Sequence, residues 1–186
     1  MIVNHNKEKL INLIIYFVTK TRHCGKTKLF KLLYLADFRC VKETGRSITG
    51  LDYYAWKKGP VPLSLFNEMK KPNGDFISTF SIVKFDESDQ LNIRPKHGKK
   101  FDDKHFTYFE LKIIENISYI YKDALAKDMV EVTHLKNTPW DKTIMTKGLF
   151  KKIDYLLAFD DDKESLSIDE YRNRKEENDE IDKILS

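Results

Sequence analysis

A strand-like segment that runs directly into a Gly-Pro pair places the strongest constraint on this fold. Residues 53–56 combine three aromatic residues with one alanine, an order that suits a half-buried β-strand. Pro60 has no amide N–H and disfavours a helix at Gly59, so we expect the strand to end and the chain to turn here. Pro62 can then open a helix. Three apolar residues would share one face of that helix: Leu65, Phe66 and Met69.

Two apolar segments before this junction are predicted to be helices. Residues 6–20 carry apolar side chains at the three- and four-residue spacing of a buried helix face, namely Ile11, Ile14, Ile15 and Val18. Thr27 is predicted to be the N-cap of a second helix that runs to about Val41. Its apolar residues repeat the same spacing: Leu29, Leu32, Leu33 and Ala36.

Residues 76–85 and 91–94 alternate as two strands, which predicts a β-hairpin able to pair with the strand at 53–56. A helical region follows to about Tyr121, on a predicted apolar stripe of Phe106, Phe109, Ile113, Ile117 and Ile120. We expect a short helix at 124–132, a break at 133–141, a further helix near 153–159 and a last helix at 168–186 capped by Ser167. The predicted class is therefore a mainly helical α+β fold, a helix bundle with a small antiparallel sheet or hairpin.

Length and charge together suggest one domain with an appendage. The 186 residues, 41% of them hydrophobic, are enough for one core, and we expect a single domain at 1–160 and an acidic C-terminal helix or tail at 161–186. Residues 1–100 carry a net charge of +10, whereas residues 160–186 hold 11 acidic and 5 basic residues. Such a tail suits a basic partner or the protein's own basic body. No apolar run reaches membrane-span length and no signal peptide is recognised, so we expect a cytoplasmic protein without a membrane partner.

Enzyme chemistry finds little support in the sequence. The Gly25-Lys26-Thr27 segment resembles the end of a phosphate-binding loop, but the required earlier glycine is replaced by Lys20. The five histidines are scattered, and the two cysteines, Cys24 and Cys40, lack a metal-binding spacing. We therefore predict no catalytic residues, no cofactor and no metal site, and do not expect an enzyme.

A DNA-binding transcriptional regulator is the alternative from the residues themselves. Basic loops at 57–58, 70–71 and 94–100 lie near aromatic residues, and helices followed by a hairpin could form a winged-helix-like reader. However, no predicted helix gathers the Arg, Asn and Gln side chains that read base edges.

Four groups of residues, taken together, resemble one known family. They are Lys28 to Asp37, Gly45 with Ile48 to Gly50, Tyr54 to Trp56 with Gly59 to Val61, and Thr133-His134 with Pro139-Trp140. In order and spacing they resemble the Panacea antitoxin domain, the SocA-like family, also described as phage-associated and GepA-like. The resemblance extends over most of residues 7–160 and leaves out the tail.

The resemblance implies a non-enzymatic antitoxin of a toxin–antitoxin system, which neutralises a genetically linked toxin by direct protein binding. It leaves the identity of the toxin and the oligomeric state open, and operator DNA is a possible second partner. Since Trp and Tyr often anchor interfaces, we predict that Tyr54, Trp56, Lys57 and Lys58 expose an aromatic and cationic surface to the toxin. The competing interpretation of Trp56 is that it fills the joint between sheet and helices.

Overall fold

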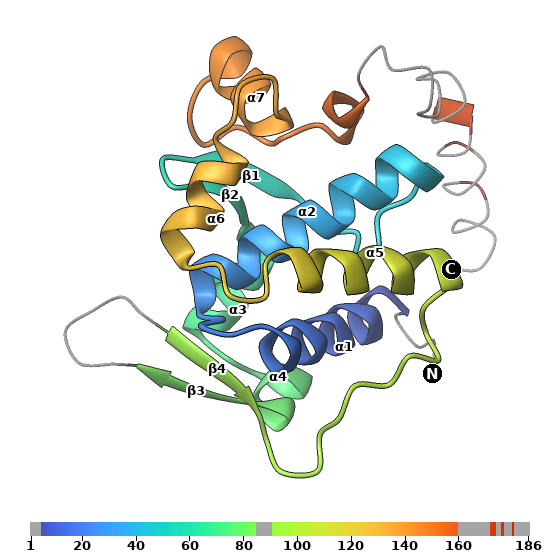
Figure 1. Ribbon diagram of the computed structural model, residues 1–186, viewed down its shortest axis with the longest axis vertical. Coiled ribbons are helices and arrows are strands. Elements are labelled where there is room, and N and C mark those ends of the chain that lie inside the picture. Colours follow the sequence, from blue (N-terminus) through green and yellow to red (C-terminus); the bar gives the residue numbers. More distant parts are fainter. Residues whose placement is uncertain (1–4, 85–90, 160–171, 174–175, 177–179, 181–186) are drawn as a thin grey trace.

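The computed structural model describes residues 5–84 and 91–159, together with residues 172–173, 176 and 180. Helices dominate and the strands form two small antiparallel pairs, so the predicted mainly helical α+β class is confirmed (Figure 1). The elements are α1 (His5–Lys20), α2 (Lys26–Thr44), β1 (Tyr53–Trp56), β2 (Gly59–Pro62), α3 (Leu63–Lys70), α4 (Gly74–Thr79), β3 (Phe80–Lys84), β4 (Leu91–Pro95), α5 (Tyr108–Ile120), α6 (Ala126–Thr133), α7 (Pro139–Lys147) and the 3-10 helix η1 (Tyr155–Ala158). Most of the predicted tail and its helix, with the cap at Ser167, lies outside the described residues.

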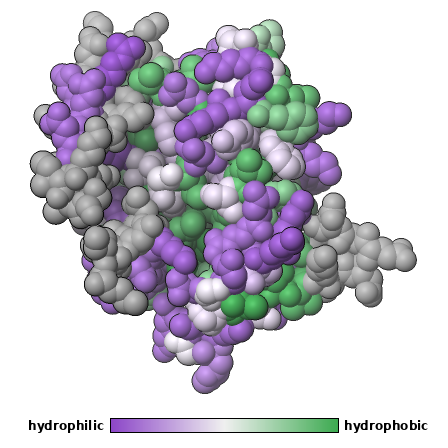
Figure 2. Space-filling view, turned by 180° about the vertical axis from the view of Figure 1, so that it is seen from behind, coloured by the Kyte–Doolittle hydropathy of each residue, from purple (hydrophilic) through white to green (hydrophobic). Residues whose placement is uncertain are grey.

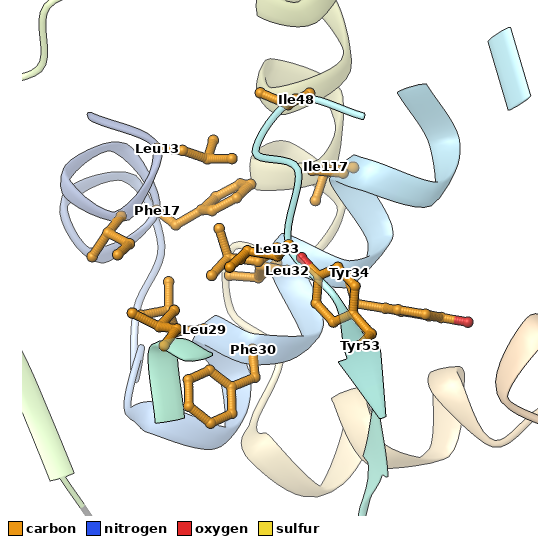
Figure 3. Close-up of a cluster of buried hydrophobic side chains, with 14 of the residues drawn as sticks. Leu13, Phe17, Leu29, Phe30, Leu32, Leu33, Tyr34, Ile48, Tyr53 and Ile117 are labelled. Carbon is orange, nitrogen blue, oxygen red and sulfur yellow. The ribbon is translucent and has the colours of Figure 1, made fainter. Parts of the chain in front are cut away.

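Helix α2 forms the centre of the molecule. Twelve of its nineteen residues are buried, which requires neighbours on nearly every side. Figure 3 shows Leu29, Leu32 and Leu33 of α2 pointing into a cluster that also holds side chains of α1 and α5. Each fully buried leucine of this kind stabilises the fold by about 1.5–3 kcal/mol. The predicted apolar spacing of α2 is thus the spacing of the core. On α1, Ile14 and Ile15 are buried, whereas Ile11 and Val18 are partly buried and pack against the cluster.

Strand β1 pairs with β2 on one edge and with an extended segment at 150–153 on the other. Phe150 donates its amide N–H to the Ala55 carbonyl at 2.7 Å, and Ala55 donates to the Lys151 carbonyl at 2.9 Å. Ile153 donates to the Tyr53 carbonyl at 2.8 Å. With both edges of β1 occupied, the β3–β4 hairpin forms a separate sheet. The predicted pairing of that hairpin with the strand at 53–56 is therefore wrong.

The prolines of β2 fit this arrangement. In the β1–β2 register, Pro60 lies opposite Ala55 and Pro62 lies opposite Tyr53. Ala55 and Tyr53 direct backbone groups to the segment at 150–153, so the residues opposite them on β2 need no amide N–H. Residues 59–62 therefore continue as a strand after the turn, where the sequence predicted only a turn and a helix start.

Several element boundaries differ from the prediction for local reasons. Helix α2 begins at Lys26, and its N-cap Gly25 makes no side-chain bond, so Thr27 lies inside the helix and is not the cap. Residues 74–79 form α4, and the strand predicted from 76 begins only at Phe80. Pro139 opens α7 within the predicted break, because Thr138 accepts a capping bond from the Asp141 amide. The helix predicted near 153–159 is only the single turn of η1.

Helix α5 buries a different stripe from the one predicted. The side chains of Thr107 and Glu110 cap its first turn reciprocally, and the helix starts at Tyr108. Its core face consists of Glu110, Ile113, Ile114, Ile117 and Ser118. Phe109 and Ile120, which the sequence placed on the apolar stripe, are exposed to 66% and 56%. The apolar pattern of this segment was therefore wider than the face that packs.

Hydrophobic and hydrophilic residues alternate over much of the surface. On the face seen in Figure 2, green hydrophobic patches are interrupted by purple hydrophilic residues. Within the described part of the chain, no helix has the length and apolar character needed to cross a membrane.

Candidate partner-binding surface

The two faces of β1 have different surroundings. Tyr53 and Ala55 are buried against the core, whereas Tyr54 and Trp56 point to the opposite face and are half-buried. This alternation follows from the two-residue side-chain period of a strand. Lys57 and Lys58 form the turn between β1 and β2 and are exposed. All four predicted contact residues thus lie on one hairpin, and none belongs to its core-facing side.

Trp56 lies in an aromatic group drawn from three parts of the chain. Its ring meets that of Phe66 on α3 edge-on at a centroid distance of 5.1 Å, and that of Phe150 at 5.7 Å. Phe150 itself is 59% exposed. Trp56 is therefore neither a buried plug nor a free surface residue, because one side packs against the domain and the group remains open at Phe150.

Lysines surround this aromatic group. The Nζ atom of Lys70 lies 4.4 Å from the centre of the Phe66 ring and that of Lys26 lies 5.5 Å away, both within cation–π range. Lys57 and Lys58 extend the positive charge along the hairpin turn. We call this set the aromatic–lysine surface; it comprises Lys26, Trp56, Lys57, Lys58, Phe66, Lys70 and Phe150.

Tyr54 lies at a separate feature of the same face. It lines an open pocket of about 390 Å³ between β1, the preceding loop and α3. Leu51, Leu63, Ser64 and Asn67 also line this pocket. Its mixture of apolar and hydrogen-bonding groups could accept a single side chain of a partner. The structure thus divides the predicted set into Trp56 with the two lysines and Tyr54 with the pocket.

The turn of the hairpin rests on a buried lysine. Gly59 has a φ angle of +91°, and a Cβ atom there would come within 2.8 Å of Lys31 Nζ and of Thr133 Oγ1. Lys31 Nζ donates a hydrogen bond of 2.8 Å to the Pro60 carbonyl. Only glycine satisfies both the backbone angle and this close approach.

Burial changes the protonation of the Lys31 amine. The side chain is 1% exposed, and burial lowers its pKa from 10.5 to about 7. A neutral buried amine can be a nucleophile. Here its bond to the Pro60 carbonyl and its contact with the turn place it beneath the hairpin, where it supports the backbone.

A histidine–tryptophan pair also holds the hairpin. Trp140 of α7 donates its indole N–H to the Trp56 carbonyl at 3.0 Å. The His134 ring stacks on the Trp140 ring at 3.9 Å between centroids. Burial, followed by the nearby charge of Lys31, lowers the pKa of His134. The Thr133-His134 and Pro139-Trp140 motifs therefore meet the Gly-Pro motif in space.

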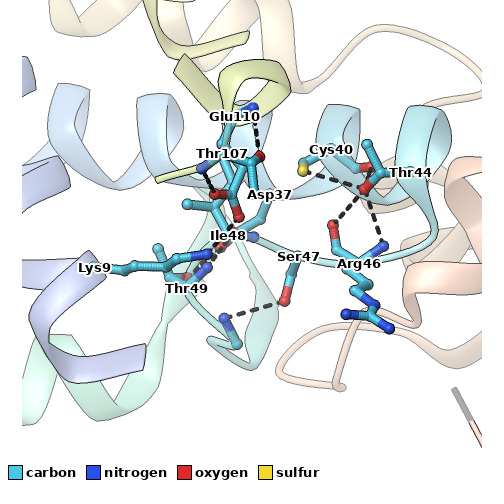
Figure 4. A network of polar contacts seen from close by, with 11 residues as sticks. Lys9, Asp37, Cys40, Thr44, Arg46, Ser47, Ile48, Thr49, Thr107 and Glu110 are labelled. Carbon is cyan, nitrogen blue, oxygen red and sulfur yellow. Dashed lines mark hydrogen bonds and ion pairs between the residues drawn. The ribbon is translucent and has the colours of Figure 1, made fainter. Parts of the chain in front are cut away.

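Asp37 fixes the loop that leads into β1. Its carboxylate accepts hydrogen bonds from the amides of Ile48 and Thr49, from the Thr49 hydroxyl and from the Tyr53 hydroxyl. Figure 4 shows Asp37 directed at Ile48 and Thr49 from α2. Burial raises the Asp37 pKa to about 6, and the four donated bonds pull it back toward the ordinary range.

Comparison with known proteins connects this geometry to one family. The family model of the SocA-like antitoxins, the Panacea domain, matches residues 29–141. That range covers more than half of the chain and includes most of α2, the β1–β2 hairpin and Trp140. The chain belongs to the SocA-like Panacea family. No curated protein and no solved structure matches it.

The charged residues of the α2 motif, of which Lys31 and Asp37 lie within the matched Panacea range, have internal positions that the sequence did not reveal. Lys28 Nζ donates to the carbonyls of Arg22, Lys122 and Ala124 at 2.7, 3.1 and 2.7 Å, which ties α2 to the segments before it and after α5. Lys28, Lys31 and Asp37 are all buried. In the sequence, these three residues are visible only as charges within an otherwise apolar helix. Such charges are usually interpreted as part of a solvent-exposed face.

Phe66 and Phe150 both contact Trp56, and the sequence did not single out either of them as part of the surface. Phe66 was assigned to the core face of the helix after Pro62, and it does pack on the core while also contacting Trp56. Phe150 reaches Trp56 only because the segment at 150–153 pairs with β1. No local pattern announces that pairing.

Metal-binding and thiol side chains elsewhere in the chain are the other groups that could support chemistry. Across residues 5–84 and 91–159, no group of three His, Cys, Asp or Glu is placed to hold a metal ion. Cys24 and Cys40 are buried and unpaired, and burial raises their pKa values to about 11 and about 12. Both are therefore neutral thiols at physiological pH.

Proposed function

We propose that this Panacea protein is an antitoxin that neutralises a genetically linked toxin by binding it directly through the aromatic–lysine surface. Membership of the SocA-like antitoxin family is the observation that carries the proposal. The geometry supplies a surface suited to that role. Trp56 sits on a hairpin that buried contacts hold from beneath, and a rigid aromatic anchor loses little conformational entropy on binding.

Phe150 supports the choice of this surface. It is a large aromatic residue, 59% exposed, and its φ angle is +63°. This left-handed conformation is uncommon for a bulky residue, and such strain often accompanies functional positions. A folded domain gains no internal packing from the exposed part of this ring, whereas a partner could cover it.

The charge of the surface indicates the chemistry of the partner's contact area. Lys57 and Lys58 lie at the tip of the hairpin, and among the described residues they form no ion pair. Two unpaired cations next to a partly exposed aromatic group fit a partner area that combines acidic and apolar groups. Such charges mainly speed association and exclude unsuitable partners, while the rings supply affinity.

The proposal is tested by growth rescue. Induced expression of the toxic reading frame beside this gene should stop growth, and co-expression of the wild-type protein should restore it. Phe150→Ala should lose most of the rescue while keeping the wild-type melting temperature, since the ring is largely exposed. Ile77→Ala, which removes an apolar side chain of α4 that is 50% exposed, is the control and should rescue fully. Full rescue by folded Phe150→Ala and Trp56→Ala variants would contradict the proposed surface.

A DNA-binding regulator is the second candidate, favoured by one exposed basic segment. Arg94, Lys96, Lys99 and Lys100 are exposed at and after the end of β4, which in Figure 1 is the end of the hairpin beside α4. Such an element could contact phosphates. Gel-shift titration of the upstream DNA at several salt concentrations decides this candidate, because phosphate binding must weaken steeply as salt rises. Absence of a shift at low salt would remove it.

A further inference from the structure

Helix α5 presents a second exposed surface, whose residue composition differs from that of the aromatic–lysine surface. Tyr108, Lys112, Glu115 and Tyr119 recur at spacings of four, three and four residues, so they form one stripe along the helix. The core face of Ile113, Ile114 and Ile117 lies on the opposite side. We call the first set the α5 stripe. Figure 1 shows α5 lying alongside α1 and α2, which cover its inner side.

The α5 stripe exposes more apolar surface than folding requires. Tyr108 and Tyr119 are exposed to 67% and 82%, and Phe109 and Ile120 flank them at 66% and 56%. Two pairs of exposed apolar residues thus lie at the two ends of a helix of thirteen residues, and exposed apolar groups gathered on one element mark interaction sites more often than single exposed residues do. The charged residues between them are Lys112 and Glu115, each 58% exposed.

The order of residues along the stripe is symmetric. Tyr108 and Tyr119 lie at equal distances from its midpoint, as do Lys112 and Glu115. If two copies of the helix pack antiparallel about a two-fold axis through that midpoint, each Tyr108 faces the other copy's Tyr119. Each Lys112 then faces the other copy's Glu115. The stripe is thus self-complementary, because aromatic residues face aromatic residues and opposite charges face each other. Self-complementarity is what an isologous interface requires.

We propose that the α5 stripe is a homodimer interface, in which two copies of this chain pack α5 against α5 in antiparallel orientation. The two tyrosine pairs supply most of the buried apolar area, and aromatic pairs favour such contacts. Lys112 and Glu115 already approach each other within one chain at 4.0 Å, a distance that leaves both able to rotate toward a partner. Their exchange between chains sets the register and orientation.

The aromatic–lysine surface does not fit the same partner. Its charged members are Lys26, Lys57, Lys58 and Lys70, so two copies of it would repel each other. The charge pattern therefore assigns a second copy to the α5 stripe and leaves the hairpin surface for a different protein. Because a single helix face is smaller than a standard interface of about 800 Å² per partner, the dimer should dissociate on dilution.

Charge exchange tests the dimer on the full-length chain by sedimentation equilibrium at micromolar to submillimolar concentrations. Wild-type protein should shift from the mass of one chain toward that of two as concentration rises. Lys112→Glu places glutamates opposite each other at both symmetric positions, and Glu115→Lys does the same with lysines. Each single variant should raise the dimer dissociation constant about tenfold or more, because the substitution places like charges opposite each other at both symmetric positions.

The double variant Lys112→Glu with Glu115→Lys is the decisive case. It restores opposite charges across the axis and should recover dimerisation to within about threefold of wild type, given the modest worth of exposed ion pairs. Lys7→Glu, which breaks an exposed pair with Asp75 elsewhere, should leave the dissociation constant unchanged. Circular dichroism establishes that each variant is folded. A wild type that stays monomeric, single variants that dimerise normally, or a double variant as weak as the single ones would each overturn the proposal.

Discussion

The two faces of β1 divide its four residues between different roles. On the inner face, Tyr53 and Ala55 meet the buried carboxylate of Asp37 and the core of α2. On the outer face, Tyr54 lines the pocket and Trp56 packs against Phe66 and Phe150. Many of the motif residues around this strand are therefore structural. Only the outward-facing positions are open to contact with another protein. Changes on the inner face should therefore alter stability, and changes on the outer face should alter binding.

Removal of the Asp37 carboxylate should give the largest loss of stability. Asp37→Ala leaves the amides of Ile48 and Thr49 and the hydroxyl of Tyr53 without their acceptor in a buried site. We expect the free energy of unfolding to fall by about 3–5 kcal/mol in urea denaturation. Asp52→Ala, at a half-exposed ion pair with Lys152, is the matched control and should cost less than about 1 kcal/mol. If Asp37→Ala lowers the free energy of unfolding no more than the small loss expected for Asp52→Ala, the buried network contributes little to stability.

Substitution of Gly59 should give the next largest loss. Gly59→Ala combines an unfavourable backbone angle with a close approach to Lys31 and Thr133, so we expect about 2–4 kcal/mol of destabilisation by urea denaturation. Gly98→Ala isolates the contact, because Gly98 also has positive φ, at +80°, but a Cβ atom there meets nothing within 4 Å. It should cost only about 1 kcal/mol, the penalty of the backbone angle alone. If the two variants are equally stable, the turn does not rest on Lys31.

The buried amine of Lys31 should appear in the pH dependence of stability. Its folded-state pKa is about 7, below the ordinary 10.5 of the unfolded chain. Between these values the unfolded chain binds a proton that the folded chain lacks, so this contribution to stability grows as pH rises and is lost as pH falls through about 7. From pH 7 to 8.5 it should amount to roughly 1–2 kcal/mol. Lys31→Met should remove that rise, as measured by urea denaturation across the range.

This pH window separates Lys31 from other groups. His134 has a lowered pKa and affects the slope below about pH 6.5, while Cys24 and Cys40 have raised values and act in the opposite sense above about pH 9. Lys57→Met, at the exposed hairpin turn, is the control and should keep the wild-type slope. A Lys31→Met variant with the same slope as wild type would show that the amine is not buried in the folded protein.

The lysines at the hairpin turn should give the smallest effect on stability. Lys57→Glu and Lys58→Glu change exposed side chains, so the free energy of unfolding should stay within about 0.5 kcal/mol of wild type. Binding to the proposed toxin should weaken, mainly through slower association that depends on salt. Surface plasmon resonance at two salt concentrations measures this. Unchanged association rates at low salt would exclude these lysines from the contact.

The sequence predicted the individual helices and strands better than the pairing between segments far apart in the chain. The helices α1, α2 and α5, the strand at 53–56 and the hairpin of β3 and β4 could be predicted because each depends on local periodicity. Strand β2 was missed because Pro60 and Pro62 argue against a strand. They fit only because β1 directs backbone groups to the segment at 150–153, and that pairing joins residues far apart in the chain.

The candidate surface was predictable in the same partial way. Trp56, Lys57 and Lys58 were identified because aromatic and cationic residues gather near one turn. Phe150 was not identified, since its contact with Trp56 arises only in the tertiary structure. Asp37 was likewise hidden, because a buried carboxylate and a solvated one look alike until the donors around it are known.

Amide hydrogen exchange with and without the proposed toxin tests the central claim most directly. The outer face of the β1–β2 hairpin and the segment beside it should be covered, so exchange at residues 56–58 and 148–151 should slow on complex formation. Residues 96–104, which lie away from the aromatic–lysine surface in sequence and include exposed positions, should exchange as before. Complex formation that leaves 56–58 and 148–151 unprotected, with protection elsewhere, would contradict the assignment of this face to the partner.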